Sequence, residues 1–258
     1  MKLFRFELKA EPGTVRSGIV FNGIIHETVG GEGVARHQPQ DVRPLSPVPQ
    51  APSLRFFRSQ NQPFTEEPEP AFFYGNPGAV VGASTIINVP SNIIDLTFEA
   101  YLAAVLVAGG YDIPVEEADD HVLGLTIMIA LLDRSALRSE GIFGRSHDLG
   151  IGLGPVVTTP DELDGNVVDQ HFGRRYKLNA AARINSVERT RGDAEDLPYT
   201  VAQAVSAASR SCTLREGDVL ALGPLCDVPE DLRLEGGDEV TVAVENLGAL
   251  SIKLSHEA

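Results

Sequence analysis

The chain is poor in cysteine and has neither tryptophan nor a long apolar run. Its two cysteines, Cys212 and Cys226, show no CxxC or metal-ligand spacing, which argues against a disulfide framework or a cysteine-bound metal. The longest apolar runs, such as residues 101–108, are far shorter than the roughly 20 residues that span a bilayer. The first residues also lack the apolar stretch and cleavage site of a signal peptide. We therefore expect a cytoplasmic protein with reduced thiols.

Basic residues are also scarce. The 258 residues include 36 acidic and only 21 basic side chains, which gives a formal net charge of −15. This balance opposes broad contact with a phosphate backbone or an anionic membrane surface, so we expect neither nucleic acid nor membrane as a partner. The hydrophobic share of 43% and the charged share of 22% are those of an ordinary globular protein.

What the sequence does contain is a series of short apolar segments separated by turns, in no regular βαβ order. Strands are predicted at 79–83, 84–89, 100–108, 124–132, 217–223, 237–248 and 249–254, and helices at 115–123 and 199–209. Proline-rich runs at 37–53 and 60–70 predict loops. We expect an α+β, strand-rich fold in which N-terminal strands and loops (1–65) pack on a larger domain (66–258).

Several motifs follow one another in a recognisable order. DLTFEAYLAAVLV at 95–107 is similar to a D-x-E-x-E-L-A-V-V strand, and GRSHDLGIGLGP at 144–155 is similar to a G-K-S-x-D motif that ends in Gly-Pro. Further similar stretches lie at 66–90, 115–127, 131–135, 215–225 and 235–250. Together they resemble the fumarylacetoacetate hydrolase family over about residues 50–254. The resemblance implies a β-roll-like core of mixed sheets with a few short helices, assembled as a homodimer.

The resemblance also implies where a metal would bind. In the family, two glutamates of an E-x-E strand and one aspartate bind Mg²⁺ or a similar ion, which polarises the oxo group of the substrate. The corresponding positions here hold Glu99, Tyr101 and Ala130, so only one carboxylate is kept. If a metal binds, Glu99 and Asp133 are its candidate ligands. Because one carboxylate with a phenol and an alanine is a poor site for Mg²⁺, we predict no metal and no other cofactor.

Two arginines and a histidine complete the candidate site. Arg134 stands at the arginine of the family's S-A-R-D motif, and Arg145 replaces the lysine of G-K-S. Two guanidinium groups that face a pocket would suit a carboxylate or a developing enolate oxygen; the alternative is that they only neutralise nearby carboxylates. His147 lies in the same motif as Arg145 and, with Asp133, is a candidate for binding the substrate.

These residues predict chemistry on a small anionic oxo-acid, enol or 1,3-dicarbonyl substrate. Glu99, Tyr101, Arg134 and Arg145 are the predicted catalytic residues, with Glu99 transferring protons and the arginines holding an anion. The family's water-activating histidine is missing from its expected place near 56–64, which favours metal-independent lyase, isomerase or cyclase chemistry in a specialised biosynthetic pathway. A metal-dependent hydrolase or decarboxylase is one alternative. A non-catalytic binding subunit is the other, and a collapsed apolar pocket would favour it.

Overall fold

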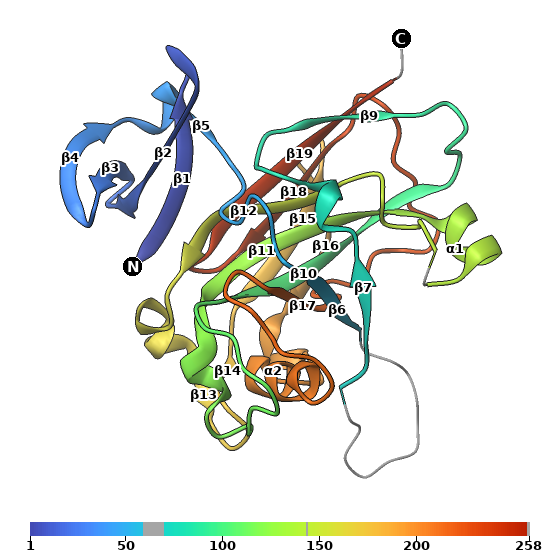
Figure 1. The fold of residues 1–258 in the computed structure, drawn as a ribbon. Helices are drawn as coiled ribbons and strands as arrows, with labels where there is room; N and C mark the ends of the chain where they lie inside the picture. The colour runs from blue at the N-terminus through green and yellow to red at the C-terminus, as the bar shows by residue number, and fades with distance from the viewer. Residues whose placement is uncertain (59–69, 143, 257–258) are drawn as a thin grey trace.

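The fold is built almost entirely from strands (Figure 1). A computed structural model describes residues 1–58, 70–142 and 144–256. In these ranges the strands form sheets of twelve, five and two members. The strand-rich α+β fold predicted from the sequence is confirmed. The domain boundary expected at residue 65 lies outside the described residues.

The twelve-stranded sheet runs in the order β4-β3-β2-β1-β12-β11-β10-β17-β6-β7, with β5 paired to β1 and β8 paired to β12. Its strands are β1 (Lys2–Leu8), β2 (Glu11–Phe21), β3 (Ile24–Val29), β4 (Glu32–His37), β5 (Val42–Pro44), β6 (Leu54–Arg58), β7 (Phe72–Gly75), β8 (Val80–Val81), β10 (Leu96–Leu106), β11 (Val122–Asp133), β12 (Ile151–Thr158) and β17 (Val219–Gly223). Both antiparallel and parallel pairs occur, so the sheet is mixed.

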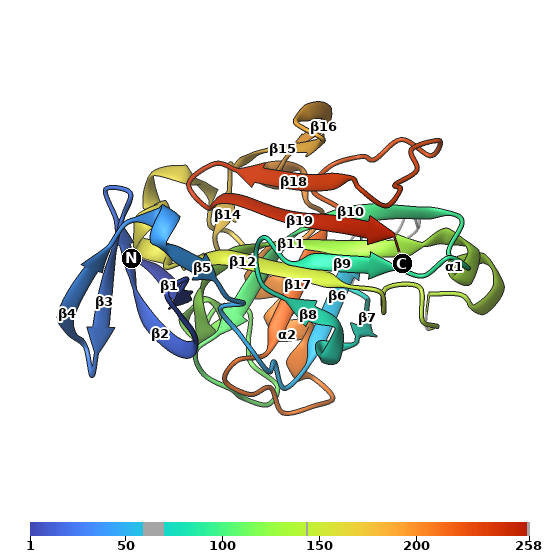
Figure 2. The same ribbon diagram turned by 90° about the horizontal axis from the view of Figure 1, so that it is seen from above.

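The second sheet covers one face of the first (Figure 2). It contains β16 (Val187–Asp193), β15 (Asn179–Ile184), β18 (Glu239–Val244), β19 (Gly248–His256) and β9 (Ile86–Val89) in that order. The small third sheet pairs β13 (Val167–Asp169) with β14 (Arg175–Tyr176). The α-helices of the described part are α1 (Arg134–Glu140) and α2 (Val201–Ser209).

Strand β10 lies at the centre of the large sheet, and all eleven of its residues are buried. Successive side chains of a strand point to opposite faces. Phe98, Ala100 and Leu102 therefore enter the main core between the two large sheets. Tyr101 and Ala103 enter a smaller core on the other face. A run that is apolar at almost every position fits a strand buried on both faces.

The two ends of the large sheet differ in what they carry. Strands β2, β3 and β4 lie at one end, and α1 lies at the opposite end, as both views show (Figures 1 and 2). Helix α1 follows β11 directly because Asp133 caps it: the Asp133 Oδ1 accepts hydrogen bonds from the backbone N–H of Ser135 (2.8 Å) and Ala136 (3.2 Å). This cap fixes where the arginines of α1 begin.

Two smaller expectations have different outcomes. The helix predicted at 199–209 is present as α2, whose first turn carries a capping box between Thr200 and Gln203. The segment 115–123 forms only a 3₁₀ turn at Ala118–His121 before β11 begins. Among the residues described, no helix has the length and apolar character needed to cross a membrane.

Candidate active site

A cavity of about 500 Å³ lies beside the start of β10, the end of β11, α1 and the segment 224–233 that follows β17. Its charged lining consists of Arg58, Arg134, Arg138, Arg233, Glu99, Asp227 and Glu230. Apolar side chains fill the wall between these groups. A concave site of this size with a few convergent polar groups is typical of a small-molecule pocket. The collapsed apolar pocket that would favour a non-catalytic subunit is not what the structure has here.

Glu99 is the most constrained acid of this cavity. One carboxylate oxygen, Oε1, accepts a hydrogen bond from Arg58 Nη2 at 2.5 Å. The other, Oε2, accepts from the Tyr101 hydroxyl at 2.5 Å and lies 3.2 Å from His147 Nε2. Tyr101 follows Glu99 by two residues on β10, so both side chains leave the same face of the strand. Each oxygen of the buried carboxylate therefore has a defined partner.

His147 holds its position through contacts on every side. Its Nδ1 lies 3.1 Å from Ser146 Oγ, and its ring packs near Phe56 and Phe73, with centroid distances of 5.3 and 5.5 Å. Because an ionised carboxylate only accepts hydrogen bonds, Nε2 carries the proton that points at Glu99. His147 thus acts as a fixed donor to Glu99.

The protonation states at this cluster follow from burial and charge. Burial raises the pKa of Glu99, but the hydrogen bond from His147, the Arg58 cation and the Tyr101 hydroxyl together bring that pKa below its ordinary value. Burial, and then the negative charge of Glu99, raise the pKa of Tyr101 well above 10. Glu99 is therefore a carboxylate at neutral pH, and Tyr101 keeps its proton.

The donor set does not fit the Mg²⁺ site implied by the family resemblance. Ala130 lies opposite Glu99 in the β10–β11 register and offers no ligand atom. Tyr101 fills its position with a buried, protonated phenol, and both oxygens of Glu99 already have partners. No cluster of three His, Cys, Asp or Glu side chains that could hold a metal occurs in the described ranges. The proposed substitute ligand Asp133 is used as the helix cap.

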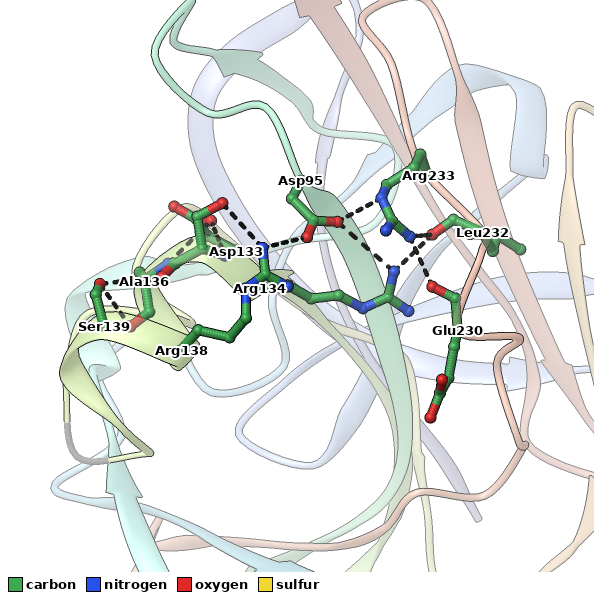
Figure 3. Close-up of polar contacts among 10 residues, drawn as sticks. Asp95, Asp133, Arg134, Ala136, Arg138, Ser139, Glu230, Leu232 and Arg233 are labelled. Carbon is green, nitrogen blue, oxygen red and sulfur yellow. Dashed lines mark hydrogen bonds and ion pairs between the residues drawn. The ribbon is translucent and has the colours of Figure 1, made fainter.

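The two arginines predicted for the site, Arg134 and Arg145, lie in different places. Arg134 lines the cavity, where its guanidinium donates to the carbonyl oxygen of Leu232 at 2.9 Å (Figure 3). It also donates to the carbonyl oxygen of Pro229 at 3.3 Å. Arg145 pairs with Glu140 at 2.8 Å, is 71% exposed, and is not part of the cavity lining. The structure thus brings Glu99, Tyr101 and His147 into contact and places Arg134 on the same cavity. It does not bring Arg145 or Asp133 to Glu99.

Cys226 also lines the cavity but is not poised as a nucleophile. Burial, and then the nearby charge of Asp227, raise the pKa of its thiol to about 11. A thiol with that pKa is protonated at neutral pH, whereas the thiolate is the nucleophilic form. This leaves the carboxylates and arginines as the candidate reactive groups of the cavity.

Sequence reasoning missed several residues of the cavity. Arg58 pairs with Glu99, and Arg138 and Arg233 line the wall near Arg134. One signal was available: Arg138 follows Arg134 by four residues, so the two share a helix face. A second was the alternation of β10, which places Thr97 on the side of Glu99; the Thr97 hydroxyl is buried without a hydrogen-bond partner.

Residues 49–255 match the family model described as fumarylacetoacetate (FAA) hydrolase, C-terminal. The chain is 26% identical over 189 residues to the oxaloacetate tautomerase YisK of Bacillus subtilis, covering 70% of this chain and 60% of the relative. It is 25% identical over 188 residues to an uncharacterised protein of Pyrococcus abyssi, covering 70% and 78%. The chain therefore spans only about 60% of the length of the tautomerase.

Solved structures share the fold over their whole length. A 5-carboxymethyl-2-hydroxymuconate delta-isomerase from Mycobacterium smegmatis superposes with a TM-score of 0.81 at 22% identity, covering 100% of both chains. A fumarylacetoacetate hydrolase from Exiguobacterium antarcticum gives the same TM-score and identity, again covering 100% of both chains. These likenesses show the fold. Because the family model matches most of the sequence, this protein belongs to the fumarylacetoacetate hydrolase family.

Proposed function

We propose that this protein is an isomerase that moves a proton on a small anionic oxo acid, in a keto–enol tautomerisation, without a bound metal. The observation that carries this proposal is Glu99: an ionised carboxylate on the wall of an open cavity, with one oxygen fixed by Tyr101 and His147 and the other paired with a partly exposed arginine. The names of the relatives, a tautomerase and an isomerase among them, support this class of reaction.

The proton transfer uses the two oxygens of Glu99 differently. Tyr101 and His147 hold Oε2, so Oε1 is the oxygen that takes the proton from the carbon next to the oxo group of the substrate. The C–H electron pair becomes the C=C bond of the enolate, and the oxo π pair moves to oxygen. Proton return to that oxygen gives the enol, and the reverse sequence regenerates the oxo acid. Tyr101 and His147 are positioning residues in this scheme.

Arg58 links substrate binding to the basicity of Glu99. It pairs with Oε1 and is 30% exposed, so an arriving carboxylate or oxo oxygen can share its guanidinium. The charge of Arg58 is one of the causes that keep the pKa of Glu99 low, whereas burial acts to raise it. Drawing Arg58 toward the substrate therefore raises the pKa of Glu99 and makes it a stronger base. The same cation stabilises the enolate oxygen as charge develops.

The test is proton exchange in deuterated water. Pyruvate and oxaloacetate are incubated with the protein, and loss of the C–H signal next to the oxo group is followed by NMR. We expect exchange above the buffer rate, reduced about 10²–10⁴-fold in Glu99→Gln, the range of a general base. Glu188→Gln is the matched control, because Glu188 also pairs with an arginine but lies on β16 outside the cavity lining.

Two outcomes would overturn the proposal. Exchange at the wild-type rate in a Glu99→Gln variant with an unchanged circular dichroism spectrum would remove Glu99 from the chemistry. Exchange that disappears after treatment with a chelator and returns with Mg²⁺ or Mn²⁺ would favour a metal-dependent activity instead.

A further inference from the structure

Three arginines of the cavity surround a second carboxylate, Asp95 (Figure 3). Arg138 Nη2 donates to Asp95 Oδ2 at 2.6 Å, Arg233 Nε lies 2.5 Å from Oδ1, and Arg134 Nη1 lies 3.8 Å from Oδ1. Arg134 and Arg138 lie four residues apart on α1, whereas Arg233 comes from the segment after β17. Three positive charges from two separate parts of the chain thus meet one negative charge.

Asp227 and Glu230 also line the cavity, but neither forms an ion pair with these arginines. Among the side chains described, no second carboxylate forms an ion pair with any of these arginines. Asp133 caps α1, and the Glu230 carboxylate points away from the cluster (Figure 3). Arg138 and Arg233 are 62% and 44% exposed. Exposed ion pairs add little to stability, and like charges repel, so anchoring Asp95 does not by itself account for three arginines.

Asp95 stands directly before β10, and Glu99 lies near the start of that strand. Thr97 and Glu99 alternate on β10, so their side chains leave the same side, and the four residues from Asp95 to Glu99 can span about 13 Å if extended. Between the two charged ends stands Thr97, whose buried hydroxyl lacks a partner. The cavity of about 500 Å³ is large for a small oxo acid alone. Its shape and charge therefore suit a longer molecule with an anionic group at each end.

On the basis of the proposed function, we propose that Arg138 and Arg233 bind a second oxyanionic group, a carboxylate or a phosphate, at the far end of an elongated acid whose reacting oxo group lies at Glu99. Planar guanidinium groups match either oxyanion through paired N–H donors. Leu132, Leu137 and Val228 line the same cavity and provide apolar contact for the chain that joins the two ends. Arg138 and Arg233 would then set specificity for the length and charge of the substrate.

Equilibrium binding of ligands that cannot react tests this subsite separately from catalysis. Two matched pairs are titrated by calorimetry: adipate against hexanoate for a distal carboxylate, and phosphoglycerate against glycerate for a distal phosphate. We expect the doubly anionic member of at least one pair to bind about tenfold more tightly, an advantage of the size that one charge-assisted contact provides. The pair that shows the advantage identifies the oxyanion.

The variants decide whether the advantage comes from these arginines. In Arg138→Met/Arg233→Met it should vanish, while hexanoate and glycerate keep their wild-type affinities. Arg191→Met is the matched control, because Arg191 pairs with Glu188 on the exposed edge strand β16, outside the cavity lining, and should change neither pair. The proposed subsite would be ruled out if the doubly anionic ligand bound no more tightly than its partner in either pair. It would also be ruled out if the tighter binding persisted in the double variant. Because these ligands do not react, the binding result can be interpreted even if the protein shows no proton exchange.

Discussion

Asp95 and Glu99 stand four residues apart and are both buried acids that pair with arginines of one cavity, yet their surroundings differ. Glu99 has one arginine, Arg58, and two further hydrogen-bonding partners, Tyr101 and His147. Asp95 has three arginines and a local excess of positive charge. Burial acts to raise the pKa of each acid, and the partners of each outweigh it.

On the two proposals made here, neighbouring acids at the start of β10 have different roles. At Glu99 the rigid, buried donors fix one oxygen and leave the other to a cation that a substrate can attract, which suits proton transfer. At Asp95 the exposed arginines retain N–H donors and charge for a further anion, which suits binding. On these proposals, the same pairing of carboxylate and arginine serves chemistry or recognition according to how many cations surround the acid and how exposed they are.

The largest effect on stability should come from Asp95→Asn. Removing this charge leaves three guanidinium groups together without a counterion, so we expect the free energy of unfolding to fall by about 2–3 kcal/mol. This is below the full cost of breaking a buried ion pair because two of the arginines are solvent-exposed. Urea unfolding measures the loss, with Glu188→Gln as the exposed control. A loss under about 1 kcal/mol would mean that the arginines do not depend on Asp95.

Tyr101→Phe should have a smaller effect, and one confined to the Glu99 end. The ring stays in place against Phe56 (5.0 Å between centroids), but Glu99 loses one hydrogen bond to a buried charge, a change of about 1.5–2 kcal/mol. Loss of that bond should also raise the pKa of Glu99, which shifts the lower limb of the exchange rate against pH upward. An unchanged pH profile would leave the hydroxyl a purely structural role.

The sequence predicted the part of the site that lies within single motifs. Alternation along β10 predicts that Glu99 and Tyr101 share a face, and the structure joins them by a hydrogen bond. His147, singled out within its loop motif, reaches the same carboxylate from a separate segment. The strand-rich fold was predictable for the same reason, because short apolar runs and turns are local signals.

The arginines were less predictable because their partners are set by register between distant strands. Arg58 reaches Glu99 through the parallel pairing of β6 with β17, where it lies opposite Gly223, and nothing in residues 54–58 alone indicates that pairing. Arg145 forms an ion pair with Glu140, five residues before it. The resemblance to the family's G-K-S motif gives no indication of this local partner. Asp133, by contrast, precedes α1 as a typical N-cap residue, so its capping role was readable in the sequence.

The smallest effect is a difference in pH dependence that isolates the charge of Glu99. Because the folded-state pKa of Glu99 lies below its ordinary value of 4.5, the group adds stability above that value and loses this contribution as pH falls through the lowered pKa. Glu99→Gln lacks this contribution, so its free energy of unfolding should approach that of the wild type as the pH falls below 4.5 and through the lowered pKa. Glu27→Gln is the matched comparison: Glu27, far from the cavity on β3, also has a lowered pKa through His37 and Arg16 despite burial. For both variants, the difference in free energy of unfolding from the wild type should become smaller in acid. Only Glu99→Gln should also lose proton exchange. If the difference in free energy of unfolding between Glu99→Gln and the wild type became larger in acid, it would contradict the ionised state of Glu99 on which the proposed chemistry depends.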